Sequence, residues 1–125
     1  MITVWLAFNA LMYLGLAAWC TLLPDRTAEA IGFAFAKPGA RSEYITVYGG
    51  MEAGLGVFFA LAAWVPAWRE TGLLLGLCLY AGLALWRLGT FLRIDGITGF
   101  PRIAFALEAA LLVTAAILWV RRGAA

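Results

Sequence analysis

Four long apolar stretches are the feature that most constrains what this chain can fold into. They cover residues 2–23, 44–65, 73–92 and 99–120, and each is bounded by polar or helix-breaking residues. A helix needs about 20 mostly apolar residues to cross the roughly 30 Å hydrocarbon core of a bilayer. Backbone polar groups must be satisfied within such a segment, which favours helices. The sequence therefore predicts an all-α transmembrane four-helix bundle.

Composition supports a bilayer as the surrounding solvent. Hydrophobic residues make up 65% of the chain and charged residues 13%, against roughly 45–50% and 25% in soluble domains. A length of 125 residues allows one domain, so residues 1–125 are expected to form a single integral membrane domain with the lipid bilayer as its main partner. The net charge is +2, and no basic cluster points to nucleic acid as a partner.

An even number of crossings predicts that both termini lie on the same side of the membrane. We call this side the terminal end of the bundle, and it includes the turn VPAWRET at 65–71. The opposite side, with the connections at 24–42 and 93–102, is the loop end. Tryptophan is enriched at membrane interfaces, and the six tryptophans fall near one end or the other: Trp5, Trp64, Trp68 and Trp119 at the terminal end, Trp19 and Trp86 at the loop end.

The connection between the first and second spans is long and half apolar. We expect a short interfacial helix over 25–31, followed by Ile31, Phe33 and Phe35, which would dip into lipid or cap the bundle. Ser42 and Thr71 are expected to be the N-caps of the second and third spans.

Charged side chains interrupt three of the spans. At 1.5 Å per residue, Glu52 and Glu108 lie about 12 Å from the loop end and Arg87 about 8 Å. Antiparallel packing would allow the three to meet, with hydroxyl groups from Tyr48 and Tyr80 nearby. The sequence thus predicts a ligand or proton site formed by these five residues.

Each polar residue inside a span also has a structural interpretation. Arg87 could extend to the lipid headgroups, and Glu52 or Glu108 could be protonated or form one half of an ion pair. If one acid pairs with Arg87, burial disfavours a charge on the other. Asn9 and Tyr13, one turn apart, are expected to hold helices together.

Glycines divide the second span into two faces. In EYITVYGGMEAGLG (43–56), Gly49 and Gly56 share the face of Glu52, while Gly50 and Gly54 point nearly the opposite way. Small residues let helices approach closely, so one face can receive a helix of the bundle and the other a neighbouring helix or protomer. We expect helix packing at Gly49, Gly50, Gly54, Gly56, Gly72 and Gly76.

Histidine is missing, and no catalytic constellation is recognisable in the sequence. Histidine is the commonest metal ligand and the usual general base. Two cysteines are too few for a four-thiolate metal site. No nucleophile with a base or phosphate loop is evident, so we expect no catalytic residue, no metal and no cofactor.

Several features resemble one family. The run TVYGGMEAGLGVFF (46–59), an arginine late in the third span, an Asp-Gly turn at 95–96 and an acid early in the fourth span resemble a bacterial family of small four-span membrane proteins. That family is classed as a domain of unknown function and is allied to the DoxX and DoxD group. The resemblance implies a bacterial inner-membrane protein, and DoxD-type relatives are associated with a quinone-linked thiosulfate oxidoreductase. The resemblance assigns no catalytic role to any residue. It implies only that the following residues belong to the family's motif: Tyr48, Gly49, Gly50, Glu52 and Gly56.

Three functions fit these features. The leading hypothesis is a non-catalytic module that binds a small amphiphile, such as a quinone or lipid, or a solute at the buried Glu/Arg cluster. One alternative is an accessory structural subunit of a larger membrane complex, such as a redox complex, or of a homo-oligomer. It would dock through Gly50 and Gly54. Another is a proton-coupled small transporter that uses the two buried acids.

Overall fold

The computed structural model describes residues 1–122, and the regular secondary structure among them is entirely helical, with no strand. The elements are α1 (Ile2–Leu22), α2 (Pro24–Ala30), α3 (Pro38–Tyr44), η1 (Ile45–Met51), α4 (Glu52–Trp64), η2 (Pro66–Trp68), α5 (Arg69–Phe91) and α6 (Phe100–Arg121).

Four helical segments are long and apolar enough to cross a membrane, namely Ile2–Leu22, Pro38–Trp64, Pro66–Phe91 and Phe100–Arg121. The second combines α3, η1 and α4, which follow one another without a break. The predicted all-α four-helix bundle is confirmed, and the structure is that of a multi-pass membrane protein.

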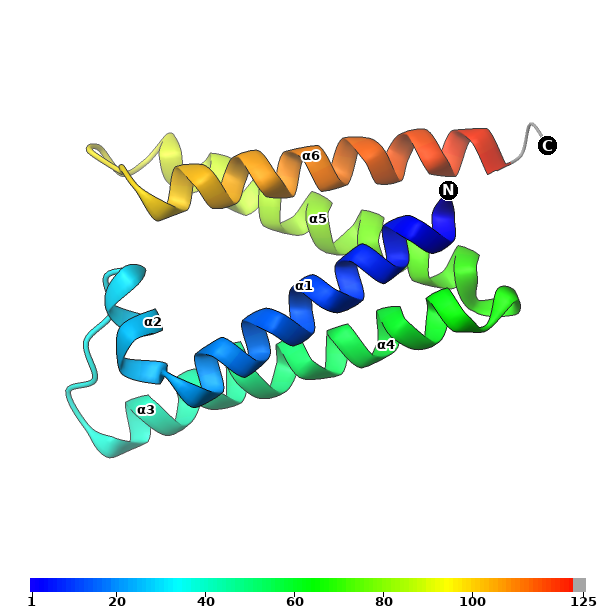
Figure 1. Cartoon of the computed structure of the whole chain (residues 1–125). Coiled ribbons are helices and arrows are strands. Elements are labelled where there is room, and N and C mark those ends of the chain that lie inside the picture. The colour runs from blue at the N-terminus through cyan, green and yellow to red at the C-terminus, as the bar shows by residue number, and fades with distance from the viewer. Residues whose placement is uncertain (123–125) are drawn as a thin grey trace.

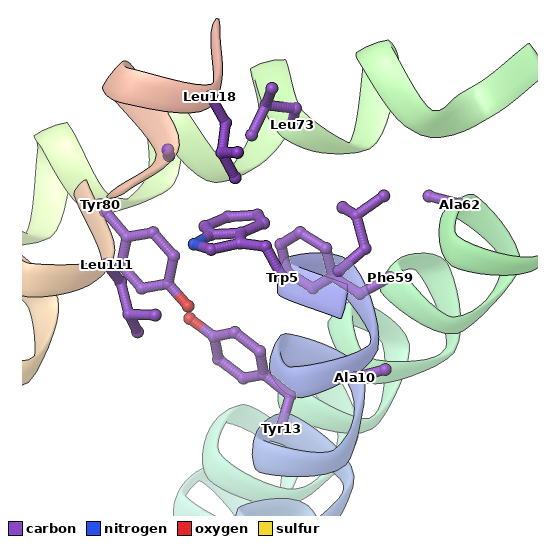
Figure 2. Packing of buried hydrophobic residues seen from close by; sticks show 11 residues of the cluster. Trp5, Ala10, Tyr13, Phe59, Ala62, Leu73, Tyr80, Leu111 and Leu118 are labelled. Carbon is purple, nitrogen blue, oxygen red and sulfur yellow. The ribbon is translucent and has the colours of Figure 1, made fainter. Parts of the chain in front are cut away.

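The bundle consists of two antiparallel helix pairs. α1 packs along α4, and α5 packs along α6, while α2 and α3 lie at the loop end (Figure 1). The two pairs meet mainly towards the terminal end, where α1 crosses α5. Residues that are far apart in sequence form the core there (Figure 2).

Trp5 lies at the centre of this core, so it is near the terminal end as predicted but faces the interior of the bundle rather than the membrane interface. The residue is only 8% exposed, and its indole Nε1 donates a hydrogen bond to Thr114 Oγ1 at 3.1 Å. Its ring meets the rings of Phe59 and Tyr80 edge-on. Gly76 on α5 leaves the space that the indole fills, so a tryptophan near the end of a span could turn inwards.

Four of the six predicted packing glycines lie at helix contacts. A Cβ on Gly56 would lie 2.7 Å from Leu14 Cγ, and a Cβ on Gly72 would lie 2.6 Å from the Cβ of Ala62. Gly49 similarly lies against Thr21, and Gly76 against Trp5. Since apolar side chains gain little from leaving lipid, such close approach is what holds membrane helices together.

Helix starts differ from the predicted caps. The second span begins at Pro38, and Ser42 lies inside it, where its backbone oxygen accepts a hydrogen bond from Thr46 Oγ1 at 2.9 Å. Pro38 suits a first helical turn because its φ is already fixed and its missing N–H is not needed there. The third span begins at the short η2 turn, so Thr71 is also interior. Both predicted N-caps are wrong.

The short helix predicted after the first span is present as α2. Pro24 begins it, and Thr27 Oγ1 donates hydrogen bonds to the carbonyl oxygens of Leu23 and Pro24. Ile31 and Phe35 then pack on a small cluster of Cys20, Ala28 and Tyr44, and Phe33 lies edge-on to Tyr44. Ile31 and Phe35 thus cap the loop end of the bundle, which is one of the two roles considered, whereas Phe33 is about half exposed.

Candidate functional site

Arg87 on α5 and Glu108 on α6 form the main charged contact inside the spans. Arg87 Nε donates to Glu108 Oε2 at 2.7 Å, and Arg87 Nη2 donates to Oε1 at 2.6 Å. Glu108 is buried, while 26% of the Arg87 side chain is exposed. Two parallel hydrogen bonds between a guanidinium and a carboxylate fix both groups and neutralise their charges.

Glu52 lies outside this ion pair. It is the first residue of α4, and its Oε2 is buried without a hydrogen-bond partner among residues 1–122. No ion pair involves Glu52 in the same part of the chain. Of the three charged residues predicted to meet, the structure joins Arg87 to Glu108 and leaves Glu52 unpaired.

Tyr80 is held by a different polar network. Its hydroxyl donates to Asn9 Oδ1 across the α1–α5 contact, and Asn9 Nδ2 donates to the Trp5 carbonyl oxygen at 2.7 Å. The Tyr13 hydroxyl faces that of Tyr80 (Figure 2). The predicted role of Asn9 in joining helices is confirmed, and the Tyr80 hydroxyl is directed to α1 rather than to Arg87.

Two tyrosines lie near the charged residues. Tyr48 stacks on Tyr44 with ring centroids 4.6 Å apart, and it is close enough to Glu52 and Arg87 to interact electrostatically with both. Tyr13 is similarly close to Glu52 and Glu108. The sequence assigned Tyr13 only to helix contacts, because spacing alone does not show that its hydroxyl lies near two acids.

Glu52 directly follows η1, a π-helical segment of seven residues over Ile45–Met51. The consecutive glycines Gly49 and Gly50 carry no side chain and weaken an α-helix. In a π-helix the hydrogen bonds run from i to i+5, so each residue turns by less than the roughly 100° of an α-helix. The side chains before Glu52 therefore point in directions around the helix axis that a regular α-helix would not predict from those after it. Such segments are frequent at functional sites.

An open groove of about 550 Å³ runs along one flank of α5 beside the ion pair. It is lined by Cys78, Leu79, Gly82, Leu83, Trp86, Arg87 and Thr90. Gly82 contributes no side chain, and a Cβ there would meet nothing within 4 Å. Cys78 and Arg87 both line this groove. The spacing of Cys78, Gly82 and Trp86, four residues apart, places them on one side of the helix. This spacing is the sequence feature that could have indicated the groove.

The fold and the site together identify the class of this protein: it is a multi-pass α-helical membrane protein with an ion pair inside its candidate spans. No protein-family model, curated protein or solved structure matches the chain. Evidence on function therefore comes from the residues and their geometry.

Proposed function

We propose that the protein is a non-catalytic membrane module that binds a small amphiphile, a quinone or a lipid, in the groove along α5. The observation that carries this proposal is the groove itself, which places a mostly apolar lining next to Arg87. An apolar tail would lie along Leu79 and Leu83, and a polar head would reach Arg87 and Thr90. Binding sites for small molecules commonly combine an apolar lining with a few placed polar groups.

The ion pair favours a neutral polar head. A guanidinium has five N–H groups, and two of those on Arg87 are used by Glu108, so three remain as donors. Because Glu108 already neutralises the charge, an uncharged acceptor can bind without separating the pair. The carbonyl of a quinone and the ester oxygen of a lipid both meet this requirement.

Glu52 supplies a second polar contact in this proposal. A carboxyl group without a cation inside a membrane is least costly when protonated, and it can then donate one hydrogen bond. Tyr48 interacts electrostatically with both Glu52 and Arg87, and on this proposal Glu52 approaches the head from α4, outside the lining of the groove. A head with two oxygens, as in a quinone, could use both.

The resemblance of residues 46–59 to the group that includes DoxD supports a quinone as the first compound to test. On that proposal the protein resides in a bacterial inner membrane with both termini on one side.

Alkylation of Cys78 tests the groove directly. Cys78 is exposed and lines the groove, whereas Cys20 is buried, so N-ethylmaleimide should modify Cys78 first in detergent-solubilised protein. A short-chain alkyl benzoquinone with a fully substituted ring, which has no free position for thiol addition, is the first probe, and a phospholipid is the second. Bound probe should slow alkylation of Cys78, measured by mass spectrometry, with Cys78→Ser giving the background.

A matched pair of variants separates groove binding from a general effect. Gly82→Leu should fill the groove, so that the probe no longer protects Cys78 from alkylation. Gly54→Leu also projects into open space but lies on α4, and it should leave this protection intact. Glu52→Ala should weaken protection by the quinone, because it removes the hydrogen-bond donor that this proposal assigns to the head, whereas Glu52→Gln keeps a donor and should preserve it. The proposal fails if neither probe protects Cys78 or if Gly82→Leu leaves protection unchanged.

The open face of η1 and α4 favours a second candidate, an accessory subunit of a larger membrane complex. Gly50 and Gly54 are exposed, and a Cβ on either would meet nothing within 4 Å. Met51 and Val57 on the same helical segment are about half exposed. A partner helix could approach closely at the glycines. Gentle solubilisation should then give a high-mass species that Gly54→Leu disrupts, and recovery of only a free monomer from the wild type would contradict this candidate.

A further inference from the structure

The connection between α5 and α6, at the loop end (Figure 1), forms a second pocket that the proposed function leaves unused. Its volume is about 490 Å³, within the roughly 300–1,000 Å³ that is usual for small-molecule sites. The end of α5, the turn after it and the beginning of α6 supply its lining: Phe91, Ile94, Asp95, Gly96, Ile97, Arg102 and Phe105. None of these residues lines the groove along α5, so the two sites are separate.

A sharp reversal of the chain shapes this pocket. Gly96 and Gly99 have φ angles of 75° and 71°, in the left-handed region that glycine adopts without strain. A Cβ on Gly96 would meet nothing within 4 Å, so the space beside the Asp-Gly turn is open. The rings of Phe91 and Phe105 meet edge-on with centroids 5.5 Å apart and supply an apolar wall. The pocket therefore has an apolar wall and an open turn.

Two opposite charges line the pocket without meeting each other. Asp95 and Arg102 both contribute to the lining, and both are exposed. Neither residue takes part in an ion pair within residues 1–122. Because both charged groups can be reached from outside, one ligand can contact the two together. Such a ligand carries an anion for Arg102 and a cation for Asp95.

Position and chemistry narrow the choice of ligand. The pocket lies where the candidate span Pro66–Phe91 ends and the candidate span Phe100–Arg121 begins, which corresponds to the headgroup level of a bilayer. A guanidinium matches the geometry of phosphate oxygens, and a carboxylate accepts hydrogen bonds from a primary ammonium. Phosphatidylethanolamine carries both groups in one head, with acyl chains below it.

We propose that this pocket binds a head that contains a phosphate and a primary ammonium, with the phosphate on Arg102 and the ammonium on Asp95. The position at the ends of two spans favours phosphatidylethanolamine as the source of this head. The glycerol region and the start of an acyl chain would then lie against Phe91 and Phe105. The site does not depend on ligand binding in the groove along α5.

Lipid competition tests the pocket. The full chain, purified in detergent, is mixed with equal amounts of phosphatidylethanolamine and phosphatidylglycerol, which has the phosphate but no ammonium. Native mass spectrometry measures which lipid is retained, and the wild type should prefer phosphatidylethanolamine. Asp95→Asn should remove this preference. Arg102→Gln should weaken retention of both lipids by about three- to fivefold, the size expected for an exposed charged contact.

Matched variants separate the pocket from the rest of the loop end. Arg93→Gln and Glu43→Gln remove the same charges from exposed residues outside the pocket, and both should keep the preference. Gly82→Leu fills the groove along α5 and should keep it too. If Gly82→Leu removes the preference while Asp95→Asn keeps it, the lipid lies in the groove and the proposal is wrong.

Folding of the variants is checked by circular dichroism. Asparagine suits a tight turn as aspartate does, so Asp95→Asn should fold. If Arg102→Gln does not fold, Arg102→Lys keeps the charge without the planar fork of the guanidinium, and it should still retain both lipids less well than the wild type.

A soluble source of the same head is tested by thermal unfolding with phosphoethanolamine. A rise in the Tm of the wild type, absent in Asp95→Asn and Arg102→Gln, would support the site with a free ligand in place of a lipid. The proposal is overturned if the wild type shows neither the lipid preference nor the rise in Tm. It is also overturned if folded variants at Asp95 and Arg102 bind as the wild type does.

Discussion

The contact between Arg87 and Glu108 shows how one residue pair can carry charge inside a bundle. Removing one partner from a fully buried pair typically costs about 3–5 kcal/mol, because the other charge is left unpaired. Exposure of 26% of the Arg87 side chain reduces that penalty, since the guanidinium can still reach water or headgroups. The pair is therefore expected to contribute less than a fully buried one.

Glu108→Gln should lower the free energy of unfolding by about 2 kcal/mol, because it removes the charged acceptor of two hydrogen bonds. The matched change Glu52→Gln should alter it by less than about 0.5 kcal/mol, because Glu52 has no ion-pair partner to lose. Unfolding in detergent, followed by circular dichroism, measures both. Equal losses in the two variants would show that Glu52 shares in the ion pair after all.

Depth along the helices was enough to predict that Arg87 and an acid would be neighbours. Counting residues from the loop end placed Glu108 and Arg87 at similar levels on antiparallel helices, and they pair. The same count placed Glu52 equally deep, but depth does not fix direction around a helix. The π-helical segment before Glu52 changes that direction, and only the glycine pair hints at it in the sequence.

At the scale of helices, glycine positions distinguish faces that pack from faces that remain open. Gly76 and Gly82 both lie in α5, yet Gly76 receives the ring of Trp5 and Gly82 leaves open space beside it. The sequence predicted that glycine faces would matter. It could not show which partner each glycine meets, because that depends on how the two helix pairs cross.

Gly76→Ala should destabilise the fold by about 1–3 kcal/mol, the usual cost of forcing an extra group into a packed core. Gly82→Ala on the same helix should be neutral or stabilising by up to about 1 kcal/mol, because alanine favours helix and nothing opposes its methyl group. Chemical denaturation of the two variants beside the wild type provides the comparison. A loss at Gly82 as large as that at Gly76 would contradict the packing described.

At the scale of the whole molecule, Trp5 connects all four spans. It belongs to α1, packs on Phe59 of α4 and Gly76 of α5, and donates its indole N–H to Thr114 of α6. The other contacts are concentrated within the pairs α1–α4 and α5–α6. The two helix pairs are thus held together at the terminal end. The loop end is covered by the cap formed by α2 and the residues after it.

Trp5→Ala should therefore separate the pairs rather than only loosen the core. Loss of a buried tryptophan typically costs about 3–5 kcal/mol. Thr114→Val removes the hydroxyl that accepts from Trp5 and that donates within α6, and it should cost about 0.5–1.5 kcal/mol. Spin labels at the exposed positions Val57 on α4 and Val113 on α6, with both native cysteines replaced by serine, report the distance between the pairs. Trp5→Ala should broaden that distance distribution, and Thr114→Val should leave it narrow. A narrow distribution in Trp5→Ala would mean that the pairs are held together without this side chain.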